Sequence, residues 1–202
     1  MVSPTPRLAT ASRQAEIVAA ALRLAQERSP ALITTTDLAQ AVGLTQGALF
    51  KHFENKEAVW LAAMEWVREN LLQEIQAAAA TSPEPLQALR KVFDAHVGFV
   101  SHHPGVPRLI FHELQQPADS PLKESVRGLM KSYRQLLLTL LKQAVQAGQC
   151  DPELDAPAAA TLFVGILQGL VMQSMISGHV STLRSEAPRV FDLYLRSLRT
   201  PV

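Results

Sequence analysis

The chain has 202 residues, a net charge of +1, and 48% hydrophobic, 5% aromatic and 18% charged residues. This length exceeds that of a minimal DNA-binding domain and allows a second core of comparable or larger size. Its one cysteine excludes an intrachain disulfide framework, and the near-neutral charge argues against a protein devoted to non-specific nucleic-acid binding. Abundant alanine and leucine, without a segment of strict polar–apolar alternation, predict an all-α protein of about nine helices.

The N-terminal segment lacks an apolar run behind its basic residues, so it does not have the pattern of a secretory signal. We expect residues 1–11 to form a flexible arm. Apolar residues then recur at helical spacing from Ile17 to Ala25, which predicts an amphipathic helix over residues 12–28. Pro30 prevents this helix from continuing.

The segment TTTDLAQAVGLTQGALFKHFENK, residues 34–56, has the pattern of two short helices joined by a tight turn. Thr34 followed by Asp37 is typical of a capping box at the start of the first helix. Gly43 stands where that helix must stop and where a positive φ is easily adopted. Thr45 is placed to cap the second helix. This arrangement predicts a helix-turn-helix, whose second helix fits the major groove of DNA.

The run from Gly43 to Lys56 places Gly, an aliphatic residue, Thr, Leu, an aromatic residue, His-Phe and then Lys in a specific order. In this order the chain resembles the TetR family of transcriptional regulators, over residues 13–61. Two positions depart from the family pattern: Phe50 replaces the usual Tyr, and Ser29-Pro30 replaces the usual Gly. The resemblance implies a DNA-binding domain over residues 1–55, followed by a ligand-binding and dimerisation domain over residues 56–202.

We expect the DNA contacts to lie on and beside the second helix of this unit. Gln46 is the candidate for direct base readout, because an amide can bond bidentately to adenine; an exposed residue that touches only water or phosphate is the alternative. Lys51 and Lys56 are expected to contact phosphates, and His52 either donates to a phosphate or packs within the domain. The predicted DNA-binding residues are Thr35, Thr36, Thr45, Gln46, Gly47, Phe50, Lys51, His52 and Lys56.

Proline and glycine punctuation divides the rest of the chain into further helices. These are predicted over residues 56–80, 85–101, 106–116, 122–146, 155–178 and 187–198.

The segment 156–179 contains no Lys, Arg, Asp or Glu and is long enough to cross a membrane. Polar residues such as Thr161 and Gln173 are spread along it, however, and a helix buried by a partner subunit has the same composition. We therefore expect a homodimer interface here, completed by the last helix across a two-fold axis. The predicted interface residues are Leu162, Gly165, Gly169, Met172, Phe191, Leu195 and Leu198.

Aromatic and polar side chains on the central helices are candidate contacts for a small, apolar ligand, although each is also a common core residue. The candidates are Phe93, His96, Phe99, Phe111, Tyr133, Phe163 and Gln168.

Neither a metal site nor an enzyme is expected. His96, His102, His103 and His112 include no His-x₃-His pair and have no cysteine partner. No Ser/His/Asp order, glycine-rich phosphate loop or paired-carboxylate spacing is present, and we expect no cofactor.

The resemblance implies a cytoplasmic, homodimeric repressor that binds a palindromic operator in double-stranded DNA. A small-molecule effector of unknown identity would release it, and no membrane would be involved. A DNA-binding activator and an architectural protein without an effector remain alternatives, because repression and activation depend on where the operator lies.

Overall fold

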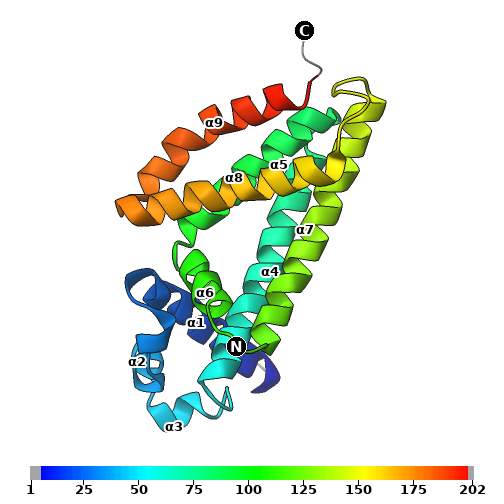
Figure 1. Cartoon of the computed structure of the whole chain (residues 1–202). Coiled ribbons are helices and arrows are strands. Elements are labelled where there is room, and N and C mark those ends of the chain that lie inside the picture. The colour runs from blue at the N-terminus through cyan, green and yellow to red at the C-terminus, as the bar shows by residue number, and fades with distance from the viewer. Residues whose placement is uncertain (1–5, 200–202) are drawn as a thin grey trace. The chain divides into compact units, whose positions relative to one another are not determined.

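The computed structural model describes residues 6–199 (Figure 1), so residues 1–5 of the predicted arm lie outside the described part. Within that range the structure has nine α-helices, one 3₁₀ turn and no strand, which confirms the all-α prediction. The elements are α1 (Pro6–Glu27), η1 (Pro30–Leu32), α2 (Thr35–Gln40), α3 (Gln46–Leu49), α4 (Lys56–Ala80), α5 (Pro85–His102), α6 (Gly105–Leu114), α7 (Pro121–Gln146), α8 (Ala156–Ser177) and α9 (Val180–Ser197).

Two helices are longer than predicted. α1 begins at Pro6, so residues 6–11, expected in a flexible arm, instead form its first turns. Proline is favoured at the first helical position, because its missing N–H has no intrahelical acceptor there. α9 begins at Val180 and carries Pro188 in its interior, close to the predicted start of the helix. A proline removes only one helical hydrogen bond, so it does not always mark a boundary.

The described residues pack as two compact units. The first contains residues up to Glu69 together with His103–Arg127, and the second contains Asn70–His102 together with the residues from Gly128 onward. Helices α4 and α7 contribute residues to both units. Helix α6 packs with α1 in the first unit.

The first unit contains a very close approach of α1 and α6. A Cβ atom added to Gly105, the first residue of α6, would lie 2.0 Å from the backbone oxygen of Leu22 and 3.0 Å from the backbone nitrogen of Gln26. Both contacts are with the backbone of α1. Glycine is therefore required here by the lack of space for any side chain.

The second unit has a core of interlocking aromatic rings. Phe93 of α5 lies 5.5 Å from Phe163 of α8 and 4.4 Å from Phe191 of α9, measured between ring centroids. Tyr194 of α9 stacks beside Phe191 and donates its hydroxyl to the backbone oxygen of Ala159 at 3.1 Å. The pairing of α8 and α9, visible in Figure 1, is thus built on ring contacts and one buried hydrogen bond.

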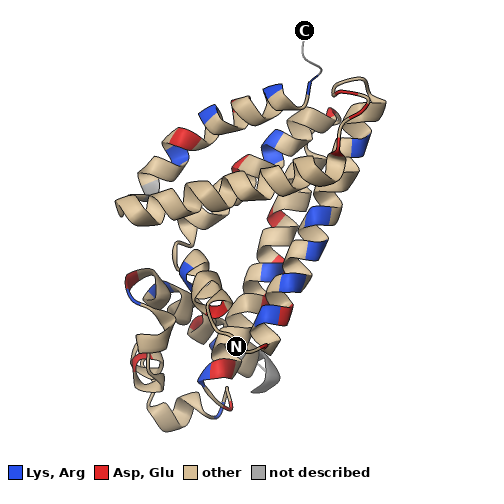
Figure 2. Cartoon of the chain, viewed as in Figure 1, with Lys and Arg blue, Asp and Glu red and all other residues tan. Residues whose placement is uncertain are grey.

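Helix α8 carries no Lys, Arg, Asp or Glu, as Figure 2 shows. It is the one described helix that is long and apolar enough to cross a membrane. Core helices of soluble proteins share this property, and α8 buries Phe163, Leu167 and Leu170 in the second unit.

Candidate nucleic-acid interface

The capping box at the start of α2 is present as predicted. The hydroxyl of Thr34 accepts from the backbone N–H of Asp37 at 3.1 Å, and the Asp37 carboxylate accepts from the backbone N–H of Thr34 at 2.7 Å. The bonds from Thr34, assisted by Arg28 at 3.1 Å, lower the pKa of Asp37. The sequence therefore determines where α2 begins through contacts three residues apart.

The turn between α2 and α3 also follows the prediction. Gly43 has φ of +67°, and the N–H of Leu44 returns to the backbone oxygen of Ala39 at 2.9 Å. Thr45 caps α3 by accepting from the N–H of Ala48 at 3.2 Å. Leu49 buries the inner side of α3, which leaves the opposite side of this single turn free.

The free side carries most of the predicted DNA-contacting residues. Thr45, Gln46, Gly47 and Lys51 are exposed, and Phe50 keeps 45% of its surface accessible. The amide nitrogen of Gln46 donates to the Thr35 hydroxyl at 2.7 Å, so the start of α2 holds the candidate base reader. Thr36 is also exposed, whereas Thr35 is half-buried.

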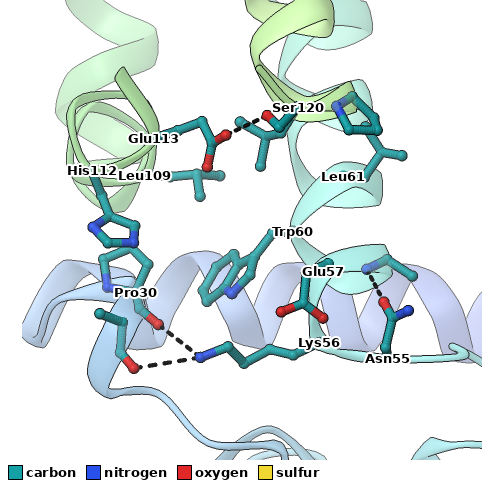
Figure 3. Close-up of a pocket in the computed structure, with 14 residues that line it drawn as sticks. Pro30, Asn55, Lys56, Glu57, Trp60, Leu61, Leu109, His112, Glu113 and Ser120 are labelled. Carbon is teal, nitrogen blue, oxygen red and sulfur yellow. Dashed lines mark hydrogen bonds between the residues drawn. The ribbon is translucent and has the colours of Figure 1, made fainter. Parts of the chain in front are cut away.

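Lys56 has partners that the sequence did not reveal. Its Nζ donates to the backbone oxygen of Ile33 at 2.9 Å and to those of Pro30 and Ala31 at 3.4 Å each; the dashed lines from Lys56 in Figure 3 mark two of these bonds. An ammonium has three donors, and all three are used. This placement argues against the predicted phosphate contact and makes Lys56 a clamp on the segment that precedes α2.

His52 is half-buried, and its Nδ1 is enclosed without a hydrogen-bond partner among the described residues. Its backbone oxygen accepts from the amide of Gln14 at 2.9 Å. Of the two alternatives for His52, this environment favours packing within the unit over donation to a phosphate.

A Lys56→Met substitution is expected to lower the free energy of unfolding by about 1–3 kcal/mol, because the backbone oxygens of Pro30, Ala31 and Ile33 lose their charged donor. It should leave the slope of log K for DNA binding against log salt concentration unchanged. Lys51→Met, the matched control on the exposed side, should change stability little and reduce that slope by about 0.9 for each phosphate that is no longer neutralised. Denaturant unfolding and binding titrations at several salt concentrations measure both quantities. A reduced slope with unchanged stability for Lys56→Met would contradict the clamp.

The predicted ligand contacts are only partly brought together. In the second unit His96 Nδ1 lies 3.1 Å from the Tyr133 hydroxyl, and the Tyr133 ring lies 6.2 Å from that of Phe163, which also contacts Phe93. Desolvation lowers the pKa of His96 to about 4, so this imidazole is neutral at physiological pH. Phe99 is also buried in this unit.

Two of the predicted ligand contacts lie elsewhere. Gln168 is exposed on α8, and Phe111 belongs to α6 in the first unit. Tyr194 belongs to the aromatic core although it is not among the predicted residues, and Phe191 lies in this core instead of at the predicted interface. The spacing of Phe191, Tyr194 and Leu198 on one face of α9 is the sequence signal for an inward-facing stripe.

An exposed apolar stripe runs along α8, formed by Leu162, Gly165, Gly169, Met172 and Ile176; we call it the α8 face. Ile176 keeps 78% of its surface accessible, and the residues alternate at spacings of three and four, as in a seam between packed helices.

The predicted interface residues of α9 fit this surface less well. Phe191 and Leu198 are 1% and 2% accessible within the chain's own core, so their assignment to the interface was wrong. Leu195 is half-buried, and Leu193 is the large exposed apolar residue of this helix.

A capped helix-turn-helix with an exposed polar side, joined to a separate helical unit, defines a DNA-binding regulator. The family model for bacterial regulatory proteins of the tetR family matches residues 17–63. The model for the tetracyclin repressor-like C-terminal domain matches residues 85–187, about half of the chain. The chain belongs to the TetR family of transcriptional regulators.

Individual relatives are distant. The HTH-type transcriptional repressor KstR2 of Mycobacterium tuberculosis is 25% identical over 144 residues, which cover 71% of this chain and 72% of that protein. The nucleoid occlusion factor SlmA of Marinobacter nauticus is 24% identical over 186 residues, covering 90% and 93%. The fold is similar to that of FadR from Bacillus subtilis in complex with stearoyl-CoA, with a TM-score of 0.77, 18% identity and coverage of 89% and 96%. The chain is accordingly a DNA-binding transcription regulator of a non-enzyme family.

Proposed function

We propose that the chain is a homodimeric repressor that binds a palindromic operator and is released by a small apolar ligand. The observation that carries this proposal is the α8 face. Its large exposed side chains, Leu162, Met172 and Ile176, are interrupted by Gly165 and Gly169, which allow a second helix to approach closely. The same face on a second copy provides a self-complementary partner, as a two-fold interface requires.

A dimer explains how so short a reading helix can be specific. α3 has only four residues, Gln46–Leu49, so one copy reaches few base pairs. Two copies related by a two-fold axis read two half-sites, and the palindrome of the operator mirrors this symmetry. Gln46 is assigned to base readout, and Lys51 to the phosphate backbone.

The aromatic core of the second unit supports an apolar effector. Phe93, Tyr133 and Phe163 are almost wholly buried, and the His96–Tyr133 pair is the polar group among them. A ligand that enters between these rings would gain apolar contact and one directed hydrogen bond. If it favours a conformation with a different spacing of the two reading helices, operator binding is abolished.

The second candidate is a DNA-binding protein that acts without an effector, as an architectural protein. The likeness to a nucleoid occlusion factor over 90% of this chain favours it. Selection of bound duplexes from a random DNA pool, with a mobility shift on the enriched sequence, tests the operator. A compound that displaces that sequence from the protein distinguishes the repressor from the architectural protein. Failure to enrich any palindrome would contradict both the dimeric reader and its operator.

A Gln46→Ala substitution is expected to weaken binding to the enriched palindrome by about 1–3 kcal/mol per half-site, because the bidentate amide bonds to the base are removed from each half-site. Binding to random duplex should change little. Gln76→Ala, at an exposed position of α4 in the second unit, is the matched control and should leave both affinities unchanged. Competition mobility shifts with both duplexes measure the difference. Equal weakening on palindrome and random duplex would assign Gln46 to the phosphate backbone instead.

A further inference from the structure

The first unit contains a cavity of about 480 Å³, shown in Figure 3, within the roughly 300–1,000 Å³ typical of small-molecule sites. Residues of η1, α6 and the first turns of α4 and α7 line it, and none of them belongs to the aromatic core of the second unit. We propose that this cavity is a second ligand site, next to the helix-turn-helix, and that it takes a lipophilic organic cation.

The lining is mostly apolar. Trp60, Leu61, Leu109 and Leu122 contribute large apolar side chains, and Pro30 contributes a ring from η1. In Figure 3 the indole of Trp60 faces the same space as Leu109 and Glu113. The face of an indole attracts a cation within about 6 Å of the ring centroid, and Trp is the strongest of the aromatic residues in this respect.

The charges in the lining do not balance. Lys56 is the one lysine of the lining, and its three donors are already given to backbone oxygens of the η1 segment. Glu57 has neither a hydrogen bond nor an ion pair within residues 6–199. Glu113 accepts from the Ser120 hydroxyl through Oε1, so its Oε2 remains available. His112 is the fourth titratable residue of the lining. The lining therefore has two carboxylates, Glu57 and Glu113, and one ammonium whose donors are all bonded to the chain itself. This charge distribution favours a positively charged ligand and disfavours a ligand with a carboxylate or a phosphate.

A ligand in this cavity would contact the segment that leads into the helix-turn-helix. Pro30 and Ala31 line the cavity and also accept the hydrogen bonds of the Lys56 clamp. Only Leu32 and Ile33 separate them from Thr34, which caps α2. A cation bound against this segment would therefore be thermodynamically coupled to DNA binding, and the coupling acts equally in both directions.

The test compares tetraphenylphosphonium with tetraphenylborate, two ions of similar shape and opposite charge, by calorimetric titration of the full chain. We expect saturable binding of tetraphenylphosphonium and much weaker binding of tetraphenylborate. Glu57→Gln together with Glu113→Gln should weaken tetraphenylphosphonium binding about tenfold or more, since both negative charges of the lining are removed. Glu54→Gln, an exposed position outside the lining, is the matched control and should leave the affinity unchanged.

Glu57→Gln alone keeps the test valid if the double variant fails to fold, because the Glu57 carboxylate holds no other group of the described chain. This single variant is expected to weaken tetraphenylphosphonium binding severalfold. Its melting temperature should fall by a few degrees at most, because Glu57 is an acidic residue in the first turn of α4. Three outcomes would overturn the proposal: no saturable tetraphenylphosphonium binding, equal binding of both ions, or an affinity that folded glutamine variants retain. The last outcome would place the cation elsewhere in the chain.

Discussion

Replacing Gly105 with alanine is expected to destabilise the protein by about 1–3 kcal/mol or more. The new Cβ would meet the backbone oxygen of Leu22 at 2.0 Å and the backbone nitrogen of Gln26 at 3.0 Å. A side chain can rotate away from such a contact, but a helix backbone cannot. α1 and α6 would therefore have to separate, which exposes part of the core that they share.

Denaturant unfolding measures this destabilisation, and Gly128→Ala provides the matched control. Gly128 also lies in a helix, α7, but a Cβ atom there meets no atom within 4 Å. Alanine at residue 128 should therefore be neutral or stabilise by up to about 1 kcal/mol. Similar free energies of unfolding for both variants would show that α1 and α6 can separate at little cost.

A Met172→Lys substitution is expected to convert the proposed dimer into monomers and to abolish operator binding. In the dimer each lysine would be buried opposite its symmetry mate, at a cost of several kcal/mol per ion. This corresponds to an increase of about a thousandfold or more in the dimer dissociation constant. Met172 is 42% accessible in the single chain, so a lysine there would be solvated in the monomer and the fold would persist.

Sedimentation equilibrium, circular dichroism and a mobility shift on the operator together measure this effect. Gln143→Lys, at an exposed position of α7, adds the same charge to the same unit and should leave the dimer intact. A Met172→Lys variant that remains dimeric and binds the operator would exclude the α8 face as the interface.

The helix-turn-helix could be predicted in detail because its determinants are local. The Thr34–Asp37 box, the positive φ of Gly43 and the Thr45 cap each depend on residues within four positions of one another. The predicted bounds of α4 are confirmed for the same reason, since Thr81-Ser82-Pro83 ends the helix locally. Such signals can be read from one sequence, because the chain itself brings the partners together.

The predictions that differ from the structure depend instead on residues that are far apart in the chain. The three acceptors of Lys56 lie 23 to 26 residues earlier in the chain, and no spacing rule indicates them. α8 carries no charged residue on any side, so periodicity could not distinguish the side of Phe163 from the side of Met172. In α9 the spacing of Phe191, Tyr194 and Leu198 marks one apolar face, and the prediction assigned Phe191 and Leu198 on this face to the partner subunit. Which apolar side faces the chain's own core depends on the other helices, and only the folded structure shows it.

The clamp formed by Lys56 gives the last residue of the family signature a structural role. The last residue of that signature joins α4 to the backbone of residues 30–33, and its three donors leave none for DNA. Selection to keep this lysine would therefore act on the stability of the fold. It would continue in a descendant that binds a different operator sequence. In such a lineage Gln46 and Lys51 would be free to diverge while Lys56 stayed fixed.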